Sequence, residues 1–300
     1  MRDPESRRNE REAGRIVYPA ASRRSGGLSL GLNLFPDGKA CSFDCPYCEV
    51  FAPQPASGPA DGGFSLEAME AELEAFLASD YADFWALEPI RDLCLSGNGE
   101  PSLSPHLGEA LGLLASVRRK HPRLLASTPV VIITNSTGFL VPSVAAILER
   151  SSREEGLVVW AKLDAGSEGQ FRRMSGIARD GAGLNLERIT RGLLAFARTS
   201  PIVVQTMLCS VDGRAPTEAD LADYAATLSS LVARGARIAE VHLYTYARPS
   251  PAVRCASLSD DSLARHAAFV RGSTRLRVRA FGRAREIAPA EAPAQPEAGA

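Results

Sequence analysis

The sequence lacks any apolar run of the roughly 18 residues that a membrane-spanning helix needs. It also lacks an apolar stretch near its charged N-terminus, so we expect no secretory leader. The sequence also lacks an excess of positive or negative charge: the 300 residues carry a net charge of −1 at pH 7, which predicts no bulk attraction to nucleic acid or to membranes. Together these absences favour a cytoplasmic protein in a reducing compartment, with no membrane partner.

Cysteine and histidine are scarce, with six Cys and four His in the chain. Three of the Cys stand together in Cys41-Ser-Phe-Asp-Cys45-Pro-Tyr-Cys48, directly after a strand-like run. The other three, Cys94, Cys209 and Cys255, are dispersed, and the first two lie in apolar runs typical of small buried residues. Because no second cysteine cluster exists, we expect no auxiliary metal cluster.

Three thiolates on one short loop can converge on one metal centre and leave one position of a four-iron cluster open to a substrate or cosubstrate. A zinc site is an alternative, but zinc needs a fourth protein ligand, and none of the four His lies near the loop in sequence. A disulfide is another alternative, but three clustered thiols cannot all pair and nothing marks the chain as secreted. We therefore favour an iron–sulfur cluster on Cys41, Cys45 and Cys48.

Short apolar runs alternate with helical patterns along most of the chain. This alternation predicts an α/β fold with parallel strands and right-handed crossovers, either a partial (β/α)6 barrel or an open doubly wound sheet. The predicted strands are Leu28–Phe35, Asp92–Ser96, Val130–Thr134, Leu157–Leu163, Ile202–Leu208 and Ile238–Tyr244. The predicted helices are Phe64–Ser79, Ser104–Lys120, Pro142–Arg150, Asn185–Arg198 and Thr217–Gly235.

The two ends of the chain differ from this pattern. Residues 1–15 are polar and charged, and residues 287–300 are rich in Ala, Pro and Glu, so we expect a disordered arm and a disordered tail. Residues 251–286 form a predicted C-terminal extension with a helix, Ser259–Arg271, and a last strand, Arg275–Phe281. The Arg row on that strand can contact phosphates, but charges also keep an exposed edge strand from pairing with another chain. We favour the second interpretation and expect no nucleic-acid partner.

Polar residues follow or end each predicted strand, and in parallel α/β folds sites lie at the carboxyl ends of the strands. These strand-end candidates also have a purely structural interpretation. The glycines that follow the second strand can form an ordinary turn, Asn135 can be a turn residue, Lys162 and Asp164 can be a structural ion pair, and His242 can be a core residue. The long stretch Gly166–Gly183, with several Arg, predicts a lid-like loop. The strand-end candidates are Ser96-Gly97-Asn98-Gly99-Glu100, then Asn135, Lys162 with Asp164, Gln205, and His242.

The cysteine spacing, with an aromatic residue before the last Cys, resembles the signature of the radical S-adenosylmethionine superfamily. Further motifs occur in the order expected of the branch that includes the wyosine-synthesis enzymes and many uncharacterised iron–sulfur oxidoreductases. The resemblance covers about residues 16–250 and favours the partial barrel over the doubly wound sheet. The motifs are Ser22-Arg23-Arg24, Ser29-Leu30-Gly31, Gly97-Asn-Gly-Glu-Pro101 and Lys162-Leu-Asp-Ala-Gly166.

The resemblance implies that the three Cys hold a [4Fe-4S] cluster whose fourth iron is chelated by the amine and carboxylate of S-adenosyl-L-methionine. Electron transfer from a reductase or a flavodoxin- or ferredoxin-type donor would cleave this cosubstrate to a 5'-deoxyadenosyl radical, which abstracts hydrogen from a substrate. The residues implied or suggested as contacts of the cosubstrate are Tyr47, Gly97, Gly99, Glu100, Asn135, Lys162, Asp164, Gln205 and His242.

The sequence identifies neither a catalytic residue nor the substrate, which we expect to be a small molecule or a peptide. Wyosine-type enzymes act on transfer RNA and carry a second cysteine set, whereas this chain has no Cys before Cys41. Two further alternatives are an activase that installs a radical on a partner protein and a non-catalytic iron–sulfur electron carrier. The electron carrier predicts no nucleoside site, so the polar strand ends argue against it.

Overall fold

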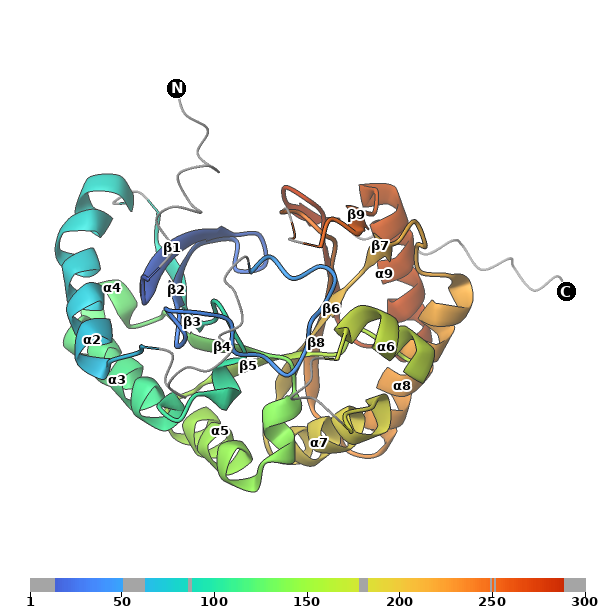
Figure 1. The fold of residues 1–300 in the computed structure, drawn as a ribbon, viewed down its shortest axis with the longest axis horizontal. Helices are drawn as coiled ribbons and strands as arrows, with labels where there is room; N and C mark the ends of the chain where they lie inside the picture. Colours follow the sequence, from blue (N-terminus) through green and yellow to red (C-terminus); the bar gives the residue numbers. More distant parts are fainter. Residues whose placement is uncertain are drawn as a thin grey trace, which may run out of the picture.

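The computed structural model describes residues 14–50, 63–85, 88–177, 183–248, 250 and 252–288. Its centre is a nine-stranded sheet with the strand order β1-β2-β3-β4-β5-β6-β8-β10-β11. Figure 1 shows this sheet curled into a half-barrel, with the long helices arranged along its outer side. The predicted α/β partial barrel is therefore confirmed.

The central strands are parallel, and each lies beside the next parallel strand in the chain. Because the strand order never reverses, right-handed crossovers place the connecting helices on one face, which excludes a doubly wound sheet. These strands are β2 Gly27–Leu32, β3 Ile90–Leu95, β4 Val130–Thr134, β5 Val158–Lys162, β6 Ile202–Met207, β8 Ile238–Tyr244 and β10 Val278–Phe281.

Four of the eight described α-helices begin at a side chain that caps them. Asn185 accepts the backbone N–H of Arg188, and Thr217 forms a capping box with Asp220. Ser104 does not cap the next helix as predicted; a 3-10 turn at residues 101–103 precedes it, and the N-cap residue is His106. The helices are α2 Leu66–Ala75, α3 Leu107–Lys120, α4 Pro122–Leu125, α5 Pro142–Glu154, α6 Glu168–Ser175, α7 Leu186–Thr199, α8 Glu218–Ala233 and α9 Asp260–Thr274, and a π-helix, Phe76–Trp85, continues α2.

Four short strands were not predicted. β1 Val17–Ser22 pairs antiparallel with β2, and β7 Cys209–Val211 pairs antiparallel with β9 Cys255–Ser257. β11 Glu286–Ile287 pairs antiparallel with β10, so β11 and not the predicted last strand forms that edge of the sheet. Ile287, predicted as the first residue of a disordered tail, instead lies in β11. Residues 1–13, 51–62 and 289–300 lie outside the described residues, so the predictions for both ends stay untested there.

Successive side chains of β5 point alternately into the main core and toward the concave face of the sheet. Val159 and Ala161 are fully buried in the core between the sheet and the helices. Trp160 belongs to a separate cluster with Cys94 and Val203, on the opposite face of the strands. This alternation directs Lys162 to the concave side as well.

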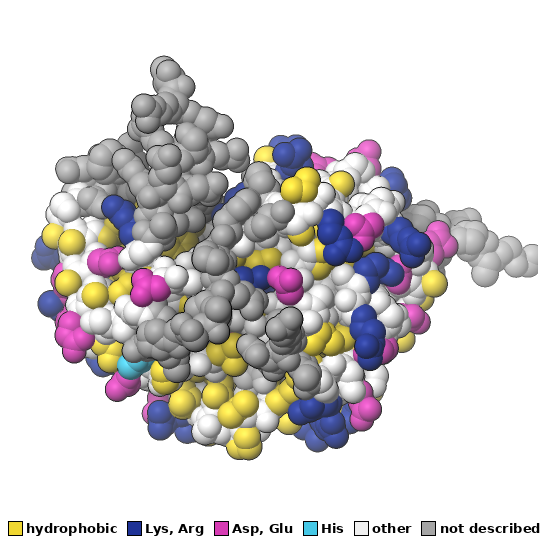
Figure 2. Space-filling view, in the orientation of Figure 1, with side chains coloured by type: hydrophobic (Ala, Val, Ile, Leu, Met, Phe, Trp, Pro, Cys, Tyr) yellow, Lys and Arg dark blue, Asp and Glu magenta, His cyan; other side chains and the backbone are white. Residues whose placement is uncertain are grey.

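Charges and apolar side chains are mixed over the surface. Figure 2 shows Lys and Arg interspersed with Asp and Glu on the face in view. None of the described helices combines the length and the apolar character needed to cross a membrane.

Candidate metal and cofactor site

The cysteine loop, residues 33–50, leaves the end of β2 and contacts segments that follow β3, β4, β5 and β8 (Figure 1). The thiols of Cys41, Cys45 and Cys48 are free, and all three residues are half-buried. The loop therefore presents its three thiols at the edge of the sheet where the parallel strands end, as the sequence predicted for the first strand.

Helix α6 anchors the cysteine loop. The backbone N–H of Asp44 donates to the carbonyls of Ser175 and Gly176 at 3.0 and 2.6 Å. The Phe43 ring packs edge-on against Phe171, with ring centroids 5.7 Å apart. The prediction of one lid-like loop over residues 166–183 is thus wrong for Glu168–Ser175, which form α6; residues 178–182 lie outside the described residues.

The glycine turn after β3, residues 97–99, packs against the cysteine loop. The backbone N–H of Glu100 donates to the carbonyl of Ala40 at 2.7 Å. A Cβ atom at Gly99 would lie 2.3 Å from that same carbonyl oxygen, so only glycine allows this approach. Gly97 has a φ of +124°, and a Cβ there would lie 2.7 Å from the Asn33 side chain. These glycines therefore position the residue that precedes Cys41.

The carboxylate of Glu100 is buried and accepts several hydrogen bonds. Its oxygens accept from the Thr134 hydroxyl at 2.7 Å, the Asn135 N–H at 2.5 Å and the Ser102 N–H at 3.1 Å. Burial raises the pKa of Glu100, although these hydrogen bonds lower it in part. In this conformation both oxygens bind protein groups of β3, β4 and their connections.

Asn135, which follows β4, points an amide donor at the first thiol. Its Nδ2 lies 3.6 Å from the Sγ of Cys41, while its Oδ1 accepts from the N–H of Thr137 at 3.0 Å and from the Thr137 hydroxyl at 2.6 Å. Because Thr137 engages the oxygen, the amide can only donate toward the sulfur. A donor at this position stabilises negative charge on Cys41.

Lys162 and Asp164 form an ion pair at the end of β5, with 15% and 12% of their side chains exposed. The Lys162 Nζ lies 3.2 Å from the Asp164 carboxylate and 2.5 Å from the hydroxyl of Tyr244. The hydroxyl of Tyr47, between the second and third Cys, donates to the same carboxylate. The pKa of Lys162 is raised: burial lowers it, but Asp164 and Tyr244 more than offset that effect.

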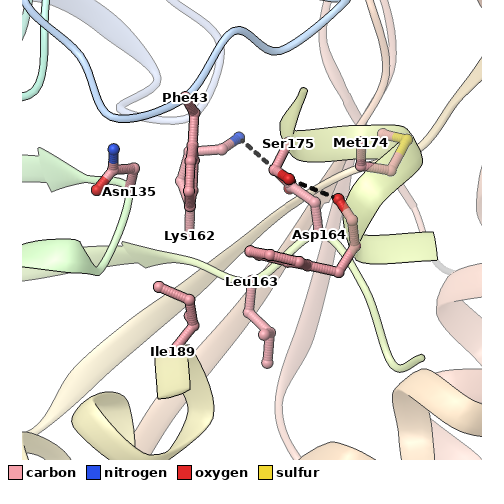
Figure 3. Close-up of a pocket in the computed structure, with 9 residues that line it drawn as sticks. Phe43, Asn135, Lys162, Leu163, Asp164, Met174, Ser175 and Ile189 are labelled. Carbon is pink, nitrogen blue, oxygen red and sulfur yellow. Dashed lines mark hydrogen bonds and ion pairs between the residues drawn. The ribbon is translucent and has the colours of Figure 1, made fainter. Parts of the chain in front are cut away.

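A small cavity lies beside this ion pair. It has a volume of about 20 Å³, which is room for about one water molecule. Figure 3 shows Lys162 and Asp164 pointing toward each other in its wall, opposite Ile189 and Leu163. The lining residues are Phe43, Asn135, Lys162, Leu163, Asp164, Phe171, Met174, Ser175 and Ile189.

Gln205 and His242 form a second group, in the middle of the concave face. The Gln205 Nε2 lies 3.0 Å from the His242 Nδ1, and the other ring nitrogen lies 2.8 Å from the Glu240 carboxylate. Arg24 donates to the Gln205 oxygen, so Gln205 donates to Nδ1 and His242 carries its proton on Nε2. Burial lowers the pKa of His242 to about 4, although Glu240 raises it in part.

Burial is the main influence on the pKa of two of the thiols. Burial, followed by the Glu100 carboxylate, raises the pKa of Cys41 to about 11, and burial also raises the pKa of Cys45. Lys39, buried and 2.9 Å from the Asp44 carboxylate, brings a positive charge to the loop. Across the described ranges, no three His, Cys, Asp or Glu side chains form a group that could hold a metal ion.

The structure thus brings Tyr47, Asn135, Lys162 and Asp164 to the cysteine loop, whereas Gln205 and His242 bond each other and Gln205 accepts from Arg24. Their roles toward a cofactor stay predictions. Lys39 and Tyr244 belong to the site although the sequence did not predict them there; Tyr244 continues the polar alternation of β8. Arg24 lies in a predicted motif, but nothing in the sequence indicates that its hairpin turn reaches β6.

No protein-family model matches the chain. Its fold is similar to three solved structures, and at identities of 12 to 16% this likeness shows the fold alone. A radical SAM methyltransferase from Sphaerobacter thermophilus matches with a TM-score of 0.57 and 16% identity over 85% of this chain and 66% of that chain. Streptococcus suis SuiB bound to S-adenosylmethionine matches with a TM-score of 0.52 and 12% identity, over 82% of this chain and 45% of that one. anSMEcpe with bound AdoMet matches with a TM-score of 0.50 and 15% identity, over 84% and 64% of the two chains.

Sequence relatives cover much of the chain. A UPF0026 protein of the cyanobacterium Synechocystis is 29% identical over 194 residues, which is 64% of each chain. A UPF0026 protein of Helicobacter pylori is 30% identical over 264 residues, covering 86% of this chain and 74% of the relative, and that of a second strain is 28% identical over 265 residues. This chain therefore belongs to the UPF0026 family.

Proposed function

We propose that this chain is a radical S-adenosylmethionine enzyme in which Cys41, Cys45 and Cys48 hold a four-iron cluster. The observation that carries the proposal is the position of the cysteine loop. Its three free thiols lie where the strands of a parallel half-barrel end, and Asn135 donates toward the first of them. The likeness of the fold to radical SAM enzymes supports the same function.

The donor set fits a four-iron cluster better than a single ion. A single zinc ion needs four ligands that converge on one point, and the described residues contain no such group of His, Cys, Asp and Glu. A cluster binds each thiolate to a different iron, so three thiols spread along one loop suffice and one iron stays open. Since burial raises the pKa of Cys41 and Cys45, cluster binding must displace thiol protons.

The neighbouring residues fit a nucleoside cosubstrate with an amino-acid end. When bound, the cluster would supply the electron that cleaves S-adenosylmethionine to a 5'-deoxyadenosyl radical. The chain would supply Asp164 as an acceptor for ribose hydroxyls, Lys162 as a cation for the carboxylate, and Glu100 as an acceptor for the amine. Because the cavity beside Lys162 holds about 20 Å³, far less than the few hundred Å³ of a typical ligand pocket, binding must displace side chains that now fill this space.

The substrate is proposed to be a small molecule or a peptide. The order of motifs resembles the wyosine branch, but the sequence has no Cys before Cys41 that could hold a second cysteine set. An external reductase or a flavodoxin- or ferredoxin-type protein would deliver the electron to the cluster. The apolar side chains of Phe43, Phe171 and Met174 would keep water from a radical formed beside them.

Anaerobic reconstitution followed by two assays tests this function. The wild-type protein should bind about four irons per chain, and after reduction it should convert S-adenosylmethionine to 5'-deoxyadenosine. The Cys94→Ala variant, altered at a buried thiol outside the loop, should behave like the wild type, whereas Cys41→Ala should do neither. Stoichiometric zinc in the protein would contradict the assignment of an iron–sulfur cluster. Bound iron without any 5'-deoxyadenosine would instead favour an electron carrier.

A further inference from the structure

The turn between β1 and β2, residues 22–26, reaches across the half-barrel. β1 and β2 stand at one end of the strand order, and β10 stands near the other. Yet Arg23 in this turn donates to the carbonyl of Gly282, just after β10, and Arg24 donates to Gln205 on β6. In Figure 1 the hairpin, in dark blue, forms one edge of the curled sheet. The turn therefore spans the open side of the half-barrel.

Internal hydrogen bonds fix the shape of this turn. The N–H of Gly26 donates to the carbonyl of Ser22 at 2.9 Å, and the hydroxyls of Ser22 and Ser25 lie 2.8 Å apart. The N–H of Ser25 also donates to the Ser22 hydroxyl at 3.1 Å. The Arg side chains are thus presented from a defined backbone, not from a loosely held loop.

Arg24 lies between aromatic rings on the concave face. Its guanidinium carbon is 5.5 Å from the centroid of Trp160 and 4.6 Å from that of Tyr244. The Tyr244 ring also contacts Lys162, whose Nζ is 5.1 Å from the ring centroid. The concave face therefore carries two cations on one aromatic ring, and the cation–π contacts offset only part of the cost of removing them from water.

Within the described residues, Arg24 has no carboxylate within ion-pair distance; its partners are an amide oxygen and two ring faces. The nearby carboxylates bind other cations or donors. Asp92, whose charge interacts with Arg24 from beyond ion-pair distance, is buried and accepts from the hydroxyl of Ser29. Glu240 pairs with Arg277 at 2.9 Å and accepts from His242, and Asp164 pairs with Lys162. A half-buried arginine that lacks a carboxylate partner is unusual, because buried charges are normally paired.

Arg23 adds to the same positive charge. Its only hydrogen-bond acceptor among the described residues is the carbonyl of Gly282. Burial lowers the pKa of Arg23, and the charges of Arg24 and Arg248 lower it further, while Glu49 raises it in part. Arg248 already pairs with Glu49 at 2.9 Å. Two adjacent guanidinium groups thus stand at the open side of the half-barrel, and among the described residues neither has a carboxylate within ion-pair distance; Glu49 and Asp92 act on them only from farther away.

We infer that Arg24, with Arg23 beside it, binds an oxyanion group of the substrate, either a carboxylate or a phosphate. The inference rests on the proposed function, because it assigns the concave face to a substrate. An arginine presents a rigid fork that matches both oxyanions, and an aromatic ring on either side restricts how it can turn. Arg24 is therefore a substrate-binding residue, while Lys162, beyond Tyr244, serves the cosubstrate.

Anion titration of the reconstituted, anaerobic protein tests the inference. The probes are inorganic phosphate and acetate, added separately at low chloride and followed by calorimetry, so that the two arms tell a phosphate site from a carboxylate site. At least one probe should bind the wild type saturably and bind Arg24→Gln roughly tenfold to a hundredfold more weakly, the range expected for a lost charge-assisted hydrogen bond. The matched control is Arg265→Gln on the exposed face of α9, which should leave binding unchanged.

A second variant places a carboxylate inside the protein. Gln205→Glu puts a negative charge against Arg24, so it should compete with the probe and abolish binding while the chain stays folded. If Arg24→Gln fails to fold, anion binding by Gln205→Glu still tests whether Arg24 forms the oxyanion site. Failure of both probes to bind the wild type, or unchanged binding in Gln205→Glu, would overturn the inference.

The inference and the proposed function can fail separately. Iron content and the response of the reduced cluster to S-adenosylmethionine are measured on the same samples. If Arg24→Gln loses that response along with anion binding, Arg24 serves the cosubstrate and the inference is wrong while the proposed function stands. If the wild type binds no iron, the proposed function is wrong, and saturable binding that requires Arg24 still supports an oxyanion site.

Discussion

The hydroxyl of Tyr47, in the cysteine loop, donates a hydrogen bond to the carboxylate of Asp164, which follows β5. The other carboxylate oxygen accepts the N–H of Met207 at the end of β6, at 2.7 Å. The same carboxylate pairs with the half-buried Lys162 at 3.2 Å. One side chain therefore links the loop, two strand ends and the principal cation of the site.

Removing this carboxylate should destabilise the protein and weaken cosubstrate binding. Asp164→Ala leaves the half-buried Lys162 without its counter-charge, and losing one partner of a buried pair costs about 3 kcal/mol, which is an upper value for this partly exposed pair. Urea denaturation measures this loss, and iron content should be unchanged because no thiol is altered. The double variant with Lys162→Met is the control: it should be less destabilised than the sum of the two single variants, whereas additive effects would contradict the coupling.

Much of the fold could be predicted because its signals are local. β4 is a run of β-branched residues, and its predicted bounds match the structure, as do those of β8. Thr217 and Asp220 mark the start of α8 through side chains only three residues apart. The short β7 and β11 lack such signals, because strands of two or three residues are formed by the strand they pair with.

The candidate site was harder to predict, because its contacts join residues far apart in the chain. Parallel pairing predicts that Asn135 and Asp164 end neighbouring strands, but it does not predict that Tyr47 reaches Asp164, 117 residues later. Nor does it predict that Arg24 contacts Gln205, 181 residues away. A turn's reach depends on how strongly the whole sheet curls, which no local pattern encodes.

His242 should make stability depend on pH. Its folded pKa is about 4 against an ordinary value of 6.5, so the unfolded chain binds more protons between these values. Stability is then fully present above pH 6.5 and falls as the pH drops toward 4, by up to about 3 kcal/mol. The charged groups facing the ring are Glu240, Arg279 and Arg24.

Comparing the unfolding free energy of the wild type with that of His242→Asn, between about pH 7.5 and about pH 5, isolates this contribution. The difference between the two proteins should shrink as the pH falls. A difference that stays constant would show that His242 does not titrate in this way.

The protein should not bind transfer RNA at physiological salt. On β10, Arg279 pairs with Glu286 at 2.7 Å, and just before it Arg277 pairs with Glu240 at 2.9 Å. Both cations are therefore neutralised and offer little to phosphates. Titration of total transfer RNA should show no saturable binding. Salt-sensitive binding that disappears when Arg275, Arg277 and Arg279 are changed to Glu would instead move the protein to the RNA-modifying enzymes.

The central claim is that the cysteine loop holds a cluster with one iron open to S-adenosylmethionine. Its most direct test is the paramagnetic resonance spectrum of the reduced, anaerobically reconstituted protein, recorded with and without S-adenosylmethionine. We expect the added cosubstrate to change the cluster signal in the wild type and in Cys94→Ala, and we expect Cys45→Ala to give no such signal. A cluster signal that S-adenosylmethionine leaves unchanged in the wild type, or one that survives in Cys45→Ala, would contradict the claim.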